Sequence, residues 1–271
     1  VMLPILLASA AFNPSIFVST RCTYTAAGKR HEPIWSREGS WGARPAIPEL
    51  QVERTQTPTE KRVPWDWKRF IQQSSRFVEL PSPFKDENAR VSLSPGESFG
   101  KLQLFPLDDV VMGGASSSAF DNGSRMWRGE VSSLNSGGFV GIRCKTQAPL
   151  DLSATQGVEL RLRPDGTARR YKFILRDSSD FNGICWTASF TVGGLQGKLA
   201  SLFSDGVETV RIPYVSLVPT IFARTVPDVS LNLENIVGCQ FALSKFEYDN
   251  GLNPLFTEGK FELTLVDVAA Y

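Results

Sequence analysis

The stretch Gly157-Val158-Glu159-Leu160-Arg161-Leu162-Arg163-Pro164 alternates apolar and charged residues and runs into the turn pair Asp165-Gly166. A period of two residues is typical of a β-strand with one buried face. The same alternation occurs over residues 171–176 and 261–265. Further strands are predicted at residues 99–105, 126–131, 139–145, 184–192, 207–213 and 237–243. About nine strands at this spacing predict an all-β chain folded as a two-sheet sandwich.

Glycine pairs mark two turns that precede this stretch. The segment Asp108-Asp109-Val110-Val111-Met112-Gly113-Gly114-Ala115-Ser116 places two glycines after an apolar run, and Gly137-Gly138 follows the predicted strand 126–131. Because glycine tolerates a positive φ, we expect Gly113 and Gly114 to adopt one, with Asp109 capping the turn. Gly137-Gly138 is expected to close a hairpin with strand 139–145.

The polar residues around these turns are the candidate binding residues. Closing the hairpin is expected to bring Asp109, Ser116 and Arg143 together beside exposed backbone amides. An arginine and a carboxylate in this setting can recognise polar groups of a partner. The predicted partner-binding residues are Asp109, Gly113, Gly114, Ser116 and Arg143. An alternative remains open, in which Asp109 pairs with Arg143 only to hold the turn.

The ordered combination of these turns and strands resembles the complex I intermediate-associated protein 30 (CIA30) family. The resemblance covers roughly Gly96 to the end of the chain. It continues through residues 157–166, Tyr171, Phe190, 211–214, 236–238, 259–263 and 270–271. The chain departs from the family pattern at Tyr214, where a phenylalanine is usual, and residues 193–205 resemble a local insertion.

Membership of that family would imply both a fold and a role. The implied fold is a jelly-roll sandwich resembling galactose-binding-like modules. The implied role is a non-catalytic assembly factor that binds intermediates of an organellar membrane electron-transfer complex, either NADH dehydrogenase complex I or a photosynthetic complex. The implied partners are subunits of that complex.

The composition argues against several other classes of protein. Lys and Arg number 29 against 28 Asp and Glu, so no nucleic-acid partner is suggested. The four cysteines contain no CxxC pair and mostly lie in apolar strand patterns, which is typical of small buried residues. The only histidine is His31, outside the predicted sandwich, so a Ser-His-Asp system is not expected there. Without a GxGxxG motif, no nucleotide site is predicted either. We therefore expect no catalytic residue, metal or cofactor.

Two alternatives to the assembly role are weighed against it. Carboxylate pairs such as Asp108 with Asp109, or Asp165 with Asp177 and Asp180, could in principle serve a glycosidase. Their positions at strand ends favour turn formation instead. Exposed aromatic residues such as Trp127 and Trp186 would suit a carbohydrate-binding module.

The N-terminal part of the chain, residues 1–62, is predicted to be a targeting leader and linker. Met2 to Ala8 is a short apolar stretch followed by Ser9-Ala10, which suits signal peptidase. Residues 12–30 contain no acidic residue, as in an organellar transit peptide. A phenylalanine, Phe12, just after the junction resembles the leaders of algae with complex plastids. The leader therefore favours the plastid, with the mitochondrion as the alternative.

One amphipathic helix of about 15 residues is predicted in the segment 63–91, ahead of a sandwich domain over 92–271. Trp67, Phe70, Ile71 and Phe77 fall at helical spacing, with basic and amide residues on the other face. Pro64 suits its first turn. The apolar stripe either packs on the sandwich or contacts a membrane or partner subunit.

Overall fold

The structure is a computed structural model that describes residues 63–78, 90–100, 102–180, 182–195, 199 and 205–271. All of these residues belong to one compact unit, Thr55–Tyr271. The predicted leader, residues 1–62, lies outside the described residues. Among the helices of the described part, none is long and apolar enough to cross a membrane.

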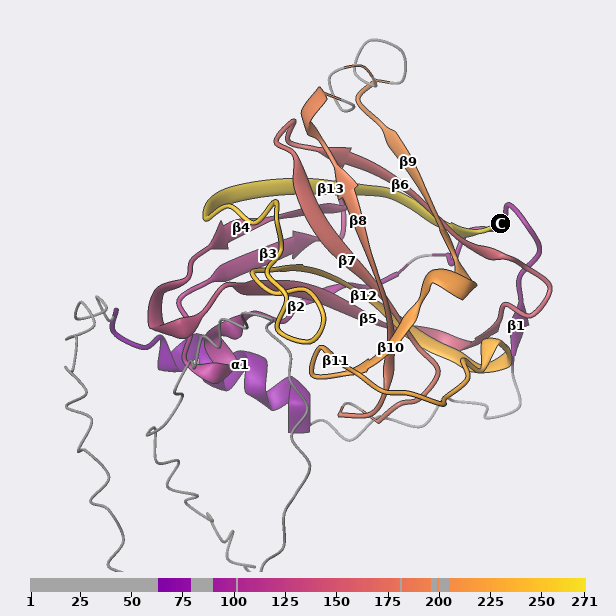
Figure 1. The fold of residues 1–271 in the computed structure, drawn as a ribbon, viewed down its shortest axis with the longest axis horizontal. Helices are drawn as coiled ribbons and strands as arrows, with labels where there is room; N and C mark the ends of the chain where they lie inside the picture. Colours follow the sequence, from indigo (N-terminus) through magenta and orange to yellow (C-terminus); the bar gives the residue numbers. More distant parts are fainter. Residues whose placement is uncertain (1–62, 79–89, 101, 181, 196–198, 200–204) are drawn as a thin grey trace, which may run out of the picture. The chain divides into compact units, whose positions relative to one another are not determined.

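Two β-sheets form the sandwich (Figure 1). The large sheet has the order β1-β5-β12-β7-β8-β10-β11, with β2 also paired to β5. Its strands are β1 (Val91–Ser92), β2 (Phe105–Pro106), β5 (Phe139–Asp151), β7 (Arg169–Arg176), β8 (Cys185–Val192), β10 (Val218–Ile221), β11 (Arg224–Thr225) and β12 (Ile236–Ser244). The small sheet has the order β3-β4-β13-β6-β9. Its strands are β3 (Ser117–Asp121), β4 (Met126–Val131), β6 (Gly157–Pro164), β9 (Glu208–Pro213) and β13 (Gly259–Ala270).

The core lies between the sheets and follows the alternation that the sequence predicted. In β6, Val158, Leu160 and Leu162 are fully buried. Aromatic rings join the two sheets, because the indole of Trp127 in β4 lies edge-on to Phe261 and also contacts Tyr171 of the large sheet. The predicted all-β, two-sheet sandwich is therefore confirmed.

Two predictions about the strands were wrong. Of the predicted strand 99–105, only Phe105 is in a strand, because Leu102 and Leu104 enter the core as irregular chain. The predicted hairpin does not form, because strand 126–131 (β4) belongs to the small sheet and strand 139–145 (β5) to the large one. The segment between β4 and β5 instead carries the chain from one sheet to the other. A glycine pair marks a turn but does not specify which sheet the next strand joins.

The predicted helix is α1 (Trp67–Val78), and it begins with Asp66 accepting a hydrogen bond from the amide of Arg69 at 3.1 Å. Of the two alternatives for its apolar stripe, packing on the sandwich does not hold for Trp67 and Ile71. Gln73 is buried and Arg69 half-buried, whereas Trp67 and Ile71 are exposed. The polar face of α1 turns inward because it supplies hydrogen-bond donors to a buried carboxylate.

Candidate functional site

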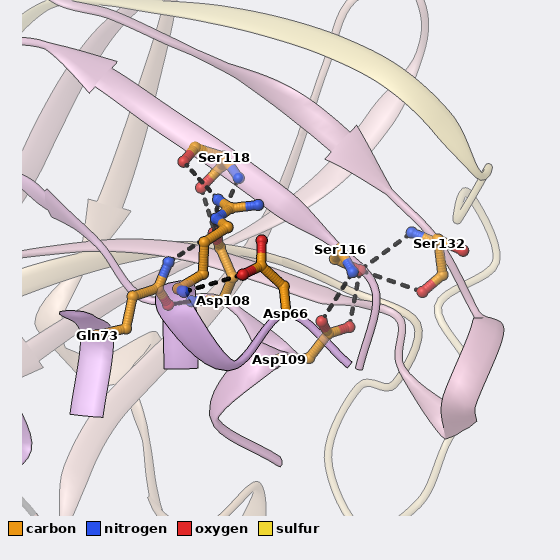
Figure 2. Close-up of polar contacts among 8 residues, drawn as sticks. Asp66, Gln73, Asp108, Asp109, Ser116, Ser118 and Ser132 are labelled. Carbon is orange, nitrogen blue, oxygen red and sulfur yellow. Dashed lines mark hydrogen bonds and ion pairs between the residues drawn. The ribbon is translucent and has the colours of Figure 1, made fainter. Parts of the chain in front are cut away.

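The carboxylate that holds α1 belongs to Asp108, whose side chain is fully buried. It accepts hydrogen bonds from the hydroxyl and amide of Ser118, at 2.6 and 2.8 Å, and from Gln73 Nε2 at 3.0 Å. The guanidinium of Arg69 completes the set at 3.1 Å. Gln73 also accepts the amide of Asp108 at 2.8 Å, so one glutamine side chain pairs with both the backbone and the side chain of this aspartate (Figure 2).

Burial has an electrostatic consequence for Asp108. Removal of the carboxylate from water raises its pKa above the ordinary value, and the hydrogen bonds from Ser118 and Gln73 and the charge of Arg69 only partly offset this. The folded protein therefore retains a proton on Asp108 at a pH where the unfolded chain has already lost it.

We predict that this carboxyl makes stability decrease as pH rises. Between the unfolded value of 3.8 and the raised folded pKa, the folded state binds more protons than the unfolded state. Its contribution is fully present below pH 3.8 and is lost as pH rises through the folded pKa. Urea unfolding of wild type and Asp108→Asn across this window measures the free energy of unfolding of each. The amount by which the wild-type value exceeds the variant value should shrink as pH rises.

Asp121→Asn is the matched control for that measurement. Hydrogen bonds from Ser124 and Gly123 lower the pKa of Asp121, so its contribution is present above the unfolded value and is lost as pH falls. The two substitutions should therefore change the slope of the free energy of unfolding against pH in opposite directions. A wild-type advantage over Asp108→Asn that is constant or grows with pH would contradict the assignment.

Asp109 carries a second buried carboxylate, and its partners differ from those of Asp108. Its side chain accepts the hydroxyl and amide of Ser116 at 2.7 and 3.0 Å and the amides of Gly138 and Phe139 at 2.7 and 3.1 Å. The Ser116 hydroxyl in turn accepts the amide of Ser132 at 3.0 Å (Figure 2). This aspartate thus joins the turn before β3 to the start of β5.

The glycines around Asp109 are explained by two different constraints. Gly113 adopts φ +91°, as predicted, with open space where a Cβ would lie. Gly114 does not have a positive φ, contrary to expectation. Instead, a Cβ at Gly114 would lie 2.2 Å from Asp109 Cγ, and one at Gly137 would lie 2.5 Å from Asp109 Oδ2. These two glycines make room for the carboxylate.

The predicted polar binding surface is not formed by its named residues. Asp109 and Ser116 are only 2% and 1% exposed. Arg143 is not among the donors to Asp109, so the alternative Asp109–Arg143 pair is also wrong. Arg143 lies within β5, opposite Phe105 and Gln240, and its Nε donates to Gln240 Oε1 at 3.0 Å. Burial, and then repulsion from Arg176, lower its pKa to about 9.

Six exposed apolar residues stand on α1, on the segment before it, on the turn after Asp109 and on the segment after β4, and we call this set the apolar platform. Its residues are Val63, Trp65, Trp67, Ile71, Met112 and Leu134. Met112 is 82% exposed and directly precedes Gly113. Each of these side chains leaves a third or more of its surface in water. Contiguous exposed apolar residues are typical of surfaces that bind a partner.

Hydrogen bonds place the parts of the apolar platform next to one another. The side chain of Asn135 bonds both the amide and the carbonyl of Val63, and it donates to the carbonyl of Gly113 at 3.1 Å. The Trp65 indole donates to the carbonyl of Val110 at 3.1 Å, and its ring contacts Phe70 at a centroid distance of 4.5 Å. Trp67 and Ile71 are one helical turn apart on α1.

Sequence reasoning missed Asp108, Gln73, Trp65 and Met112 as members of this region. Only Asp108 carried a usable signal. Ser116 and Ser118 are two residues apart, so in an extended chain they face the same way, toward two adjacent aspartates. Gln73 had no such signal because its partner is 35 residues away.

An open groove of about 650 Å³ adjoins Asp108 on the outer face of β3, β4 and β13. Its lining includes Arg69 and pairs of opposite charge. Lys260 lies opposite Glu130, and Glu262 opposite Arg128, across β13 and β4. These charges already face complementary neighbours, and the groove offers no distinct chemistry.

The residues that suggested other functions have structural roles. Trp127 and Trp186 are buried, so they cannot form an exposed platform for a sugar. Asp165 accepts the amide of Thr167 at 2.8 Å, and Asp180 that of Asn182 at 3.0 Å, as turn-forming aspartates do. Asp177 accepts the Trp186 indole at 3.0 Å. Among the described residues, no three His, Cys, Asp or Glu side chains gather as a metal site.

Comparison with known proteins gives one family and several distant folds. The model of the family described as complex I intermediate-associated protein 30 matches residues 97–265, which include both buried carboxylates and the turn that follows them. A family 11 carbohydrate-binding module from Clostridium thermocellum, solved with a beta-1,3-1,4-mixed-linked tetrasaccharide, is 16% identical with a TM-score of 0.39, covering 65% of this chain and 92% of that one.

Two further solved structures are similar to a comparable extent. The family 11 module of the cellulosomal cellulase Lic26A-Cel5E of Clostridium thermocellum is 14% identical, with a TM-score of 0.38 over 66% of this chain and 93% of that one. The agarase AgWH50C is 7% identical, with a TM-score of 0.37 over 65% of this chain and 24% of that one. No curated protein matches the sequence.

Proposed function

Because the chain belongs to the complex I intermediate-associated protein 30 family, whose members are associated with complex I assembly, we propose that it is a non-catalytic assembly factor. Its partners would be subunits or intermediates of an organellar membrane electron-transfer complex, either NADH dehydrogenase complex I or a photosynthetic complex. Of the polar residues first expected to bind the partner, Asp109 and Ser116 are buried and Arg143 is half-buried within β5. The proposal therefore moves partner binding to the apolar platform.

The observation that carries this proposal is the exposure of Met112 beside a rigidly held turn. A side chain that is 82% exposed adds little to the core, yet the two buried aspartates fix the backbone on which it stands. A surface that is already ordered loses little conformational entropy on binding. Apolar residues in this setting fit subunit surfaces that are exposed only in an intermediate.

We predict that Met112→Asp lowers co-purification of complex subunits about tenfold, the size typical of an interface residue that matters. The melting temperature should change little, because the side chain lies in water. Affinity purification from isolated organelles, followed by native-gel identification of the subunits, measures the effect. Val215→Asp is the matched control, since Val215 is 96% exposed at the turn after β9. Equal recovery with both variants would rule out this location.

The same experiment identifies the compartment. We propose import into an organelle, with the plastid favoured by the leader and the mitochondrion as the alternative. Respiratory subunits among the co-purified proteins would assign the chain to the mitochondrion, and photosystem subunits to the plastid.

We further propose that the α1 side of the apolar platform contacts the membrane that holds the complex. Of the four residues first suggested, Trp67 and Ile71 are exposed, Phe70 packs on Trp65, and the side chain of Phe77 lies outside the described residues. Residues 61–78 contain five basic residues and one acidic residue, a net charge of +4, whereas the whole chain carries +1. Tryptophan beside positive charge suits an anionic lipid surface.

We predict that the protein co-sediments with phosphatidylcholine vesicles only when an anionic phospholipid is present, and that salt weakens the binding. Trp67→Ala combined with Ile71→Ser should reduce binding several-fold. Phe222→Ser is the control, because Phe222 is 79% exposed in the turn between β10 and β11 and is not part of α1. Binding that is indifferent to lipid charge, or lost equally in the control, would contradict membrane contact through α1.

A further inference from the structure

Two cysteines face each other in the middle of the large sheet. Cys144 of β5 is the register partner of Cys239 of β12, and their sulfur atoms are 3.2 Å apart. The residues are 3% and 0% exposed and belong to the hydrophobic core. Both are free thiols, and they are 95 residues apart in the sequence.

The backbone geometry of this pair suits a covalent bond. Residues directly opposite each other in antiparallel strands have Cα atoms roughly 4.5–5.5 Å apart. That interval falls within the roughly 4.4–6.8 Å found for disulfides. The two side chains already point to the same face of the sheet and touch. A bond between them therefore needs a movement of the sulfur atoms and no change of register.

The two thiols are not equivalent. The contact from Cys239 lowers the pKa of Cys144, and burial opposes this effect. The pKa of Cys239 is raised by the same contact and by complete burial. A thiolate is the attacking species in disulfide exchange, so loss of a proton from one of the two thiols starts the reaction.

We propose that Cys144 and Cys239 form a dithiol–disulfide couple that is oxidised by a small disulfide such as glutathione disulfide. The Cys144 thiolate attacks glutathione disulfide, which breaks its S–S bond and releases one glutathione. The Cys239 thiolate then attacks the mixed disulfide on Cys144 and releases the second glutathione. The two cysteines together lose two electrons and two protons, and both are recovered in the two glutathione thiols.

The bond would act on the part of the sheet that supports the apolar platform. The amides of Gly138, just before β5, and of Phe139, its first residue, bind Asp109, and β12 is the neighbour of β5 along most of its length. A covalent link between these strands closes a long loop in the unfolded chain, which restricts the unfolded state and favours the folded one. Oxidation is expected to raise the melting temperature by about 5–15 °C.

The test is to refold the full chain from urea with glutathione disulfide, so that burial does not limit access to the thiols. Free thiols are then labelled with a maleimide under denaturing conditions, and the peptides are identified by mass. We expect a peptide pair linked through Cys144 and Cys239, two hydrogen masses lighter than the reduced peptides. The gain in melting temperature should disappear when dithiothreitol is added.

Cysteine variants separate this pair from the other thiols. Cys185→Ser should leave both the linked peptides and the gain in melting temperature intact, because Cys185 contacts Thr220 on another part of the sheet. Cys239→Ser should abolish both. Labelling of Cys144 and Cys239 after refolding, persistent glutathione on Cys144, or an oxidised protein that melts no higher than the reduced one would each overturn the proposal.

Discussion

Replacing Asp109 with alanine is expected to lower the free energy of unfolding by about 3–5 kcal/mol. The carboxylate is the acceptor for the amides of Gly138 and Phe139 and for both polar groups of Ser116. In the alanine variant the three amides would stay buried without this acceptor, whereas the Ser116 hydroxyl keeps the carbonyl of Ser132 at 3.1 Å. Each unsatisfied group costs about 1–3 kcal/mol before the surroundings relax. Urea denaturation followed by tryptophan fluorescence measures the loss.

Two further variants show whether the loss comes from the buried donors. Asp109→Asn keeps the shape but turns one acceptor into a donor, so its cost should be intermediate. Asp121→Ala removes an exposed turn-forming aspartate that also accepts two hydrogen bonds, and it should leave the unfolding transition nearly unchanged. An alanine variant of Asp109 as stable as that of Asp121 would mean that the carboxylate does not organise the turn.

Gly114→Ala is the second change for which we expect a large effect, a loss of about 3 kcal/mol or more. The added Cβ would overlap the carboxylate of Asp109, with 2.2 Å to its Cγ and 2.4 Å to Oδ1. Gly113→Ala provides the contrast, because its Cβ would enter open space and only the positive φ is strained. That strain costs about 1 kcal/mol. Thermal or urea unfolding of both variants should give a clear difference between adjacent glycines.

A double-mutant cycle connects the two effects. If the methyl group of Gly114→Ala acts by displacing the carboxylate, it should cost much less in a protein that already carries Asp109→Ala. Because the two groups share one site, the combined loss should fall well short of the sum. Additive losses would indicate that Gly114 is required for some reason other than room for Asp109.

The sequence predicts the strands well wherever one face of the strand is buried. The structure confirms strands at β6, β7 and β13, and the alternation in β6 and β13 follows from a core between two sheets, whereas β7 is buried along nearly its whole length. The alternation fails at residues 99–105 because Leu102 and Leu104 are buried without pairing to a strand. Burial of apolar side chains therefore does not by itself imply a strand.

The candidate site was harder to predict because its decisive contacts are long-range and polar. The turn and its glycines could be located, yet the side of α1 that faces the sandwich could not. Apolar spacing put Trp67 and Ile71 on one stripe, but it left open whether that stripe packs on the sandwich or contacts a membrane or partner subunit. In the structure, the need to satisfy the buried Asp108 turns Gln73 inward instead. Such a demand is visible only once the partner of each polar group is known.

The position of β13 in the small sheet constrains when the protein can fold. β13 lies between β4 and β6, although β3, β4, β6 and β9 all precede it in the chain. During synthesis, β4 and β6 therefore have no shared neighbour until residues 259–270 have emerged from the ribosome. The small sheet is thus completed only after β13 has been synthesised, and a nascent chain that stops before Gly259 would expose the core face of both strands to chaperones and proteases.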